Sequence, residues 1–394
     1  MSSTTSAASA GSADAAFPET PMKSRLQGFL AGTRVLDLSR HLPGPLATLL
    51  LADMGAEVTK VESPAGDELR FIGPIGPNGR SLFFDAINAG KRSIRLDLKT
   101  EEGQAALRSL AASADVLVES FRPGVMARLG LGADTLRAAN PGLIYVAMSG
   151  YGQDGPLRDA AGHDANYLAL NGTLSATGTA RNLSYMYPPM ADCTASMFAI
   201  SSVLGALIAR GRDGLGCEID LALADVMMPF QVFALAELGF NGRVPGPETE
   251  FLNGGWACYR PYRLRDGSDV ALGAIEPQFW SAFCQASERL DWLPRQDEPL
   301  PQLALIAELS AYFAEMSLAE CDARYAAADC CLTVVLDLNQ AVDSEYMRER
   351  RLVRQHPEMR IYEAAYPVCV NGLRPDLRRP LLEDDSCSMR IREM

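Results

Sequence analysis

The chain has 394 residues, enough for a large buried core in two domains or in one elaborated domain. Its 49 acidic residues outnumber its 36 basic residues, and the formal net charge of -13 disfavours nonspecific binding to nucleic acid. Any anionic ligand must therefore be held by locally placed arginines and lysines.

The N-terminal stretch "MSSTTSAASAGSADAAFPETP" is rich in serine and alanine, and the first basic residue is Lys23. This composition predicts a disordered tail over residues 1–29. It does not indicate a transit peptide, which would carry arginines.

A βαβ pattern follows the tail. "RVLDL" (34–38) predicts a buried strand, "PGPLATLLLADMG" (43–55) a helix and "AEVTKVES" (56–63) a second strand. The alternation continues through strand 93–98, helix 99–114, strand 115–120, helix 124–132 and strand 142–150. It predicts an α/β fold with a Rossmann-like, doubly wound and mostly parallel sheet.

The sequence is helix-rich over about 190–240, then hairpin-like around 255–275, and after that helical and acidic. We expect a large domain over 30–225, a smaller α+β domain over 226–345, and a C-terminal segment, 346–394, that returns to the large domain. The Pro/Gly-rich "NGRVPGPETE" (241–250) is the best boundary marker.

Missing motifs and the residue composition limit the possible cofactors and the location of the protein. "SRHLPGPLA" follows the first strand without G-x-G-x-x-G, and no Walker A motif occurs, which argues against a dinucleotide cofactor. Nine scattered cysteines without CxxC spacing indicate reduced thiols and a cytoplasmic location, and three histidines argue against a histidine-rich metal site. No apolar run predicts a membrane span.

Three acid or histidine positions have ordinary structural interpretations when each is taken alone. His163, in "AGHDANYLALNG", is a lone histidine of the kind that is often structural. Asp192, in "YPPMADCTAS", could be the N-cap of a long apolar helix, and Glu276, in "GAIEPQFW", could cap a helix that starts at Pro277.

In this order and spacing, the three motifs resemble those of α-methylacyl-CoA racemases, within the class III CoA-transferase superfamily. "GQDGP", "SFRPGVMARLGLG" and "ADCCLTVVLDLNQA" are similar to the same family, so the resemblance extends from about residue 30 to about residue 345. The C-terminal "RPDLRRPLLEDDSCSMRIREM" departs from the usual family ending.

The resemblance implies an isomerase with two catalytic bases. His163 and Asp192 would stand on opposite faces of the acyl-CoA α-carbon, and Glu276 would orient His163. Inversion through an enolate needs one group to remove the proton and another to return it from the other side. Burial should raise the pKa of Asp192, and the helix start beside it should hold the enolate oxygen.

The resemblance also implies how CoA is held. Its phosphates would contact Arg92, Lys99, Arg122 and Arg128, although each of these cations could equally be a solvated surface charge. Asp164 and Tyr167 would line the pantetheine and thioester end. Ser63 stands where relatives would carry an arginine, and Lys60 could compensate for it.

Two other functions stay open. The small residues "CTAS" after Asp192 are closer to class III CoA-transferases, in which the aspartate is a nucleophile that carries the acyl group and then CoA. An acyl-CoA-binding protein without catalysis is the third possibility. The resemblance further implies an interlocked homodimer and no cofactor besides the CoA of the substrate. A branched fatty acyl, a bile-acid or an arylpropionyl chain would fit equally.

Overall fold

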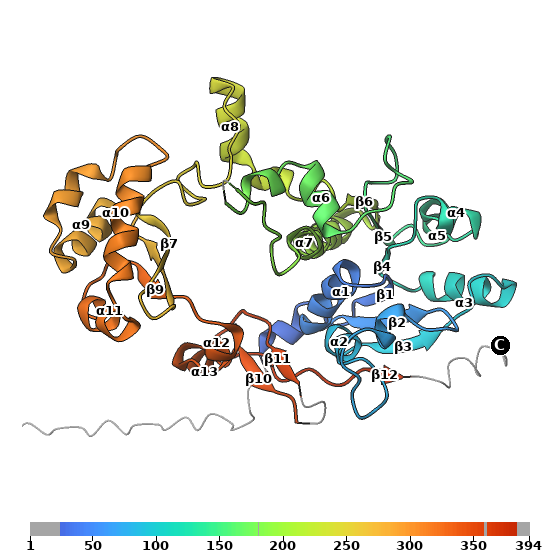
Figure 1. Ribbon diagram of the computed structural model, residues 1–394. Coiled ribbons are helices and arrows are strands. Elements are labelled where there is room, and N and C mark those ends of the chain that lie inside the picture. The colour runs from blue at the N-terminus through green and yellow to red at the C-terminus, as the bar shows by residue number, and fades with distance from the viewer. Residues whose placement is uncertain (1–23, 180, 358–360, 384–394) are drawn as a thin grey trace, which may run out of the picture.

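The centre of the fold is a parallel seven-stranded sheet. The computed structural model describes residues 24–179, 181–357 and 361–383, so most of the expected N-terminal tail lies outside the described residues. Every strand pairing in the sheet is parallel, in the order β12-β3-β2-β1-β4-β5-β6 (Figure 1). The strands are β1 (Arg34–Leu38), β2 (Glu57–Glu62), β3 (Arg92–Arg95), β4 (Val116–Glu119), β5 (Ile144–Ser149), β6 (Glu218–Ala222) and β12 (Leu382–Glu383). The predicted α/β fold with a parallel sheet is confirmed.

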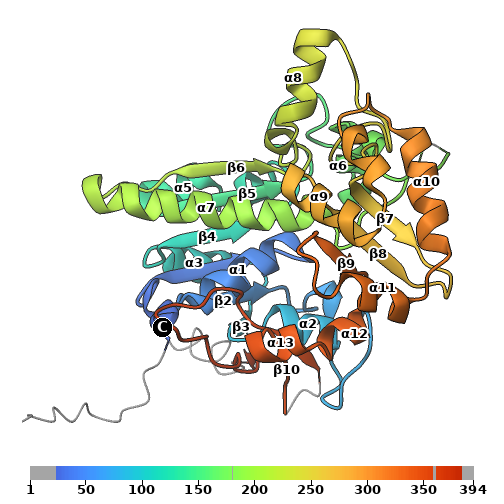
Figure 2. The same ribbon diagram turned by 90° about the vertical axis from the view of Figure 1, so that its left-hand side faces the viewer.

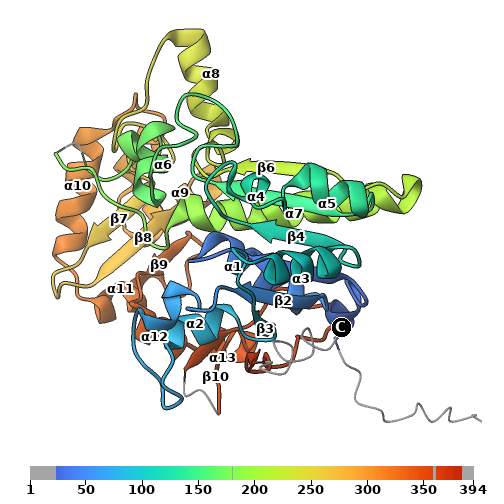
Figure 3. The ribbon, with the colours of Figure 1, turned by 90° about the vertical axis from the view of Figure 1, so that its right-hand side faces the viewer.

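Helices cover both faces of the sheet, as Figures 2 and 3 show from opposite sides. Consecutive strand residues point to opposite faces, so Val35 packs into one hydrophobic core and Leu36 into the other. The first core lies under α1 (Pro43–Asp53) and α7 (Met190–Asp213). The second lies under α3 (Glu101–Ala111), α4 (Val125–Arg128) and α5 (Ala133–Ala139). Near-continuous apolar strands are expected where both faces are buried.

Some elements differ from the sequence prediction. The helix expected over 124–132 ends at Arg128, because Gly130 takes a positive φ of 67° and turns the chain into α5. The short helix α2 (Leu82–Ile87) and the strands β6 and β12 were not predicted. Ser81 caps α2, since its hydroxyl accepts a hydrogen bond from the Phe83 N–H at 3.1 Å.

A second group of elements has its own core. Strands β7 (Tyr259–Arg263), β8 (Asp269–Gly273) and β9 (Leu332–Val334) form an antiparallel sheet, accompanied by α9 (Pro277–Ala286), α10 (Leu303–Ala314) and α11 (Leu318–Tyr325). Stacked aromatic rings fill the space between them, with Phe283 in contact with Trp280, Trp292 and Phe313. Figure 1 shows this group beside the parallel sheet, at the left.

The C-terminal part of the described chain lies against the parallel sheet. Helices α12 (Leu338–Val342) and α13 (Glu345–Arg350) lead into the hairpin of β10 (Val353–Gln355) and β11 (Tyr362–Ala364). The Arg378 guanidinium then forms an ion pair of 2.7 Å with Asp53 at the end of α1, and β12 pairs with β3. In Figure 1 the red strand β12 therefore lies beside β3.

Helix α7 is long and apolar enough to cross a membrane by length and composition, with 24 residues and a mean hydropathy of 1.6 in its most apolar window. The sequence analysis did not anticipate this property. The helix packs on α1, where the Ser196 hydroxyl donates to the Pro43 carbonyl at 2.7 Å. A core helix passes the same test of length and composition, so α7 is weak evidence for a membrane span.

Candidate active site

A cavity of about 350 Å³ opens at the C-terminal edge of the parallel sheet. Ligands of open α/β sheets bind outside the carboxyl ends of the strands. Here Arg40, Ser120 and Ser149 line the cavity from the ends of β1, β4 and β5. His163 and Asp192 line the same cavity. The structure thus brings together two of the three predicted catalytic residues.

His163 immediately precedes helix α6 (Asp164–Leu170). Its backbone N–H donates to the Asn166 side-chain oxygen at 3.0 Å, which fixes the start of the helix. The side chain itself is exposed and lines the cavity. The imidazole is therefore accessible to a ligand.

Asp164 links the two predicted bases through the backbone. One of its carboxylate oxygens accepts hydrogen bonds from the Ala191 N–H at 2.7 Å and from the Asp192 N–H at 3.2 Å. Asp164 thus caps helix α7 from another segment of the chain. Asp164 itself is not among the residues that line the cavity, so its place beside the thioester stays a prediction.

This cap corrects two expectations about Asp192. Helix α7 begins at Met190 after Pro189, so Asp192 lies inside the first turn and is not the N-cap. The Asp192 and Ala191 N–H groups are bound to Asp164, and the Cys193 N–H is bound to the Pro189 carbonyl. These donors are already occupied and cannot hold an enolate oxygen.

The Asp192 carboxyl has the altered acidity that the sequence analysis predicts. Burial raises the pKa of Asp192 to about 6, and the negative charge of Asp164 contributes to the increase. The charge of His163 acts in the opposite direction. A carboxyl with this pKa can both accept and donate a proton near neutral pH.

Asp192→Asn should stabilise the protein at pH 7. The folded pKa of about 6 lies above the ordinary 3.8, so the unfolded chain loses this proton at lower pH than the folded protein does. The carboxyl therefore destabilises the fold progressively from pH 3.8 to 6, and fully above that. We expect a gain of about 1–2 kcal/mol in the free energy of unfolding at pH 7. Urea unfolding at pH 7 and below pH 4 measures it. The gain should vanish in acid, and the exposed Asp154→Asn should show none; equal stability of Asp192→Asn and the parent chain at both pH values would contradict the account.

Tyr167 supports the wall that carries His163. Its hydroxyl donates to the Gly162 carbonyl at 2.6 Å, and its ring meets Tyr151 edge-on at 5.3 Å. Burial raises the pKa of Tyr167 to about 12, so its hydroxyl stays protonated. Tyr167 lines the cavity as predicted. Ser149 is also a lining residue, and its buried hydroxyl has no hydrogen-bond partner among the described residues.

A second cavity, of about 320 Å³, adjoins the first and shares Arg40 and Phe121 with it. Lys99 and Ser63 line this second cavity, whereas Arg122 lines the first. Arg92 and Arg128, the other two predicted phosphate contacts, line neither of them.

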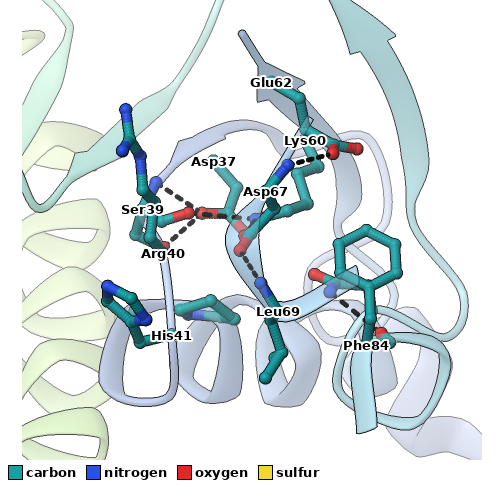
Figure 4. A network of polar contacts seen from close by, with 12 residues as sticks. Asp37, Ser39, Arg40, His41, Lys60, Glu62, Asp67, Leu69 and Phe84 are labelled. Carbon is teal, nitrogen blue, oxygen red and sulfur yellow. Dashed lines mark hydrogen bonds and ion pairs between the residues drawn. The ribbon is translucent and has the colours of Figure 1, made fainter. Parts of the chain in front are cut away.

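Lys60, which was expected to compensate for Ser63, lines the second cavity together with Ser63, but its ammonium is already bound by other groups of the protein. The Lys60 ammonium is buried, forms an ion pair of 3.0 Å with Asp67 and donates to the Ser39 carbonyl at 2.9 Å (Figure 4). These contacts hold its charge inside the protein. Lys60 instead stabilises the end of β1, from which Arg40 and His41 project.

A buried ion pair that sequence reasoning did not identify lies next to the chain segment that follows β1. Lys91 and Asp37 form a contact of 3.0 Å, and both side chains are 0% exposed. The Lys91 ammonium also donates to the Thr48 hydroxyl at 2.8 Å and to the Asn88 side-chain oxygen at 2.9 Å. The Ser39 hydroxyl donates a hydrogen bond to Asp37, so the network connects β1 and α1 with the residues that follow β1 and line the cavity.

Glu276 and His163 do not line the same cavity in the single chain. Glu276 occupies the N-cap position of α9, with Pro277 next, as the structural interpretation predicts. Its side chain is exposed and makes no capping hydrogen bond. It is not among the residues that line the cavity of His163 and Asp192.

Sequence reasoning missed three basic residues of the first cavity: Arg40, His41 and Arg158. The guanidinium of Arg40 lies over the Phe121 ring, 5.3 Å from its centroid. The position of Arg40 and His41 directly after the first strand was an available signal, because that edge of a parallel sheet binds ligands.

Comparison with known proteins agrees with this geometry. The chain matches the family described as CoA-transferase family III over residues 30–386. It is 35% identical to mouse alpha-methylacyl-CoA racemase over 328 residues, which cover 82% of this chain and 81% of the relative. It is 39% identical to the succinate--glutarate CoA-transferase of Agrobacterium fabrum over 251 residues, 62% of each chain. The crystal structure of a CAIB/BAIF family protein from Brucella suis superposes with a TM-score of 0.79 at 28% identity, covering 92% of this chain and 98% of that one. The chain belongs to CoA-transferase family III.

Proposed function

We propose that the protein is a racemase or epimerase of 2-methylacyl-CoA thioesters. The observation that carries this proposal is the presence of both His163 and Asp192 in one cavity, with the pKa of Asp192 raised to about 6. A thioester α-carbon between the two groups would lose its proton to one and regain a proton from the other. The intermediate would be a planar enolate.

The second candidate is a CoA-transferase, and the similarity to the Agrobacterium fabrum enzyme favours it as strongly as the racemase relatives favour the first. In that reaction the Asp192 carboxylate would attack the thioester carbonyl, which gives a mixed anhydride and releases the CoA thiolate. The thiolate would then attack the aspartyl carbonyl, release the donor carboxylate and form an aspartyl-CoA thioester. A transferase has no use for a base at His163. The accessible imidazole in the cavity therefore supports the racemase.

One experiment separates these reactions in the unmodified protein. A single enantiomer of a 2-methylacyl-CoA is incubated with the protein in deuterated water, and intact-protein mass is recorded in parallel. A racemase incorporates deuterium at the α-carbon and forms both enantiomers. CoA attached to Asp192 without deuterium incorporation would establish the transferase, and neither signal would leave an acyl-CoA-binding protein.

We place the CoA phosphates near Lys99 in the second cavity, with Arg122 closer to the thioester. Lys99→Ala should raise the dissociation constant for free CoA about tenfold at low salt, because one charge-assisted contact is lost. Calorimetry at low and high salt measures this change, and salt should weaken binding to the parent chain. Arg108→Ala, on the exposed face of α3, is the control. If both variants bind free CoA with the same affinity, Lys99 is not a contact of the CoA phosphates.

We further propose that Glu276 acts on His163 of a second copy of the chain. Helix α8 (Val232–Asn241) supports a dimer because it has no buried residue in the single chain and leaves Phe240 90% exposed. Co-expressed His163→Ala and Glu276→Gln chains, isolated as mixed dimers through two tags, should then contain one intact site. Their turnover should be roughly half that of the parent dimer. Turnover no higher than that of the two variants alone would place Glu276 in the same chain or outside the mechanism.

A further inference from the structure

A third cavity, of about 550 Å³, shares His41 with the cavity of His163 and Asp192. Its walls come from α1, α2 and β11, which lie together in Figure 1. They present mainly apolar side chains, among them Leu42, Leu49, Leu69, Phe83 and Ile87. A volume between about 300 and 1,000 Å³ with apolar walls is typical of sites for small organic ligands.

His41 connects this cavity to the proposed chemistry. It lines both the apolar cavity and the cavity of Asp192 and His163. Its backbone φ is +64°, an unusual value for a residue with a side chain, and the first residues of α1 follow directly. In Figure 4 His41 and Leu69 lie on the same side of the Asp37–Lys60–Asp67 network. A chain that leaves the thioester past His41 therefore enters apolar surroundings.

The charged residues of the apolar cavity form ion pairs and hydrogen bonds with other side chains and with the backbone. The Arg378 guanidinium contacts Asp53 at 2.7 and 2.8 Å and donates to the Ala364 carbonyl at 2.9 Å. The Glu363 carboxylate accepts a hydrogen bond from the backbone N–H of Arg378 at 3.2 Å. Glu68, which is not a lining residue of this cavity, lies 3.9 Å from the His41 ring. None of these groups offers an unshared positive charge to a second carboxylate.

We infer that this apolar cavity binds the hydrocarbon acyl chain of the thioester, and that it disfavours acyl chains ending in a carboxylate. The inference rests on the proposed function, whose α-carbon lies between His163 and Asp192. It specifies the substrate as an uncharged acyl group long enough to pass His41. Short dicarboxylic acyl groups leave the cavity empty or place a charge among apolar side chains, which is unfavourable.

The test uses binding as well as turnover. Dissociation constants are measured by calorimetry for free CoA and for 2-methylacyl-CoA thioesters with main chains of about four to twelve carbons. Each methylene that enters the cavity should tighten binding about fourfold until the cavity is full. A thioester of the same length with a terminal carboxylate should lose this gain.

Two phenylalanines provide a matched pair of variants. Phe83 lines the cavity and is 53% exposed, whereas Phe71 is 73% exposed and is not among its lining residues. Phe83→Ala should weaken binding of the longest chain about fifteenfold, which corresponds to the loss of about two methylene contacts, and leave the binding of free CoA unaffected. Phe71→Ala should change neither. Ala86→Phe, which fills the cavity from α2, should remove the dependence on chain length.

The outcomes separate this inference from the proposed reaction. Chain-length dependence and its loss in Phe83→Ala and Ala86→Phe would support the acyl site, even in a protein that shows no α-proton exchange. Equal affinity for all chain lengths, or tighter binding of the carboxylated thioester, would overturn the acyl site. That result would leave the racemase standing if deuterium still enters the α-carbon.

Discussion

His163→Ala should abolish racemisation while Asp192 still exchanges the α-proton of one enantiomer with solvent. Loss of one of two bases removes the step that delivers a proton to the opposite face, so inversion should fall by at least about 10²–10⁴-fold. The remaining carboxyl can remove and return a proton on its own face without inversion. Chiral separation and deuterium analysis by mass spectrometry, applied to each enantiomer separately, measure both activities.

Asp192→Ala should show the complementary pattern, with exchange confined to the other enantiomer. A purely structural role for either side chain predicts something else, since a damaged fold would lose both exchanges together. Retained binding of free CoA serves as the control for folding. If both variants exchange the same enantiomer, or if His163→Ala racemises at the rate of the parent chain, the two-base mechanism is wrong.

Lys91→Met should destabilise the protein by about 3–5 kcal/mol, because it leaves the Asp37 carboxylate buried without its principal partner. Burial alone would raise the pKa of Asp37, but the charges of Lys91 and Lys60 and two hydroxyl hydrogen bonds hold it well below its usual range. Burial lowers the pKa of Lys91 to about 8, and Asp37 opposes that shift. Urea unfolding at pH 7 measures the loss.

Two further variants make the Lys91 result specific. Arg265→Met removes an exposed ion pair of 2.7 Å with Glu320 and should cost less than about 1 kcal/mol. Adding Asp37→Asn to Lys91→Met should recover part of the loss, because the unpaired charge is then removed. A loss in Lys91→Met as small as that in Arg265→Met would show that this pair contributes little.

The parallel sheet could be predicted because its central strands β1, β4 and β5 consist mostly of apolar residues and alternate with helical segments. Strand β1 is an example: Val35 and Leu36 face different cores, so both must be apolar. Strand β12 could not be predicted in this way. It has two residues, and its place beside β3 depends on contacts such as that between Arg378 and Asp53, which are 325 residues apart.

The site was partly readable from short motifs. His163 and Asp192 could be named because each lies in a recognisable sequence context, and the raised pKa of Asp192 follows from its burial. The cap that Asp164 provides to α7 could not be predicted, since it joins segments 27 residues apart whose proximity depends on the folded sheet. The same applies to Lys60, whose charge is directed inward by Asp67.

The bond between Asp164 and the start of α7 has a mechanical consequence. His163 is the neighbour of Asp164 in the chain, and Asp164 binds the backbone N–H of Asp192, so the backbones of the two proposed bases are tied to each other. A change in the distance between the two side chains must then come from rotation of the side chains and not from movement of the backbone. In a racemase built this way, the substrate α-carbon would move between two side chains whose backbones stay in place. The rate of turnover would then depend on how readily the bound acyl group can move within the cavity.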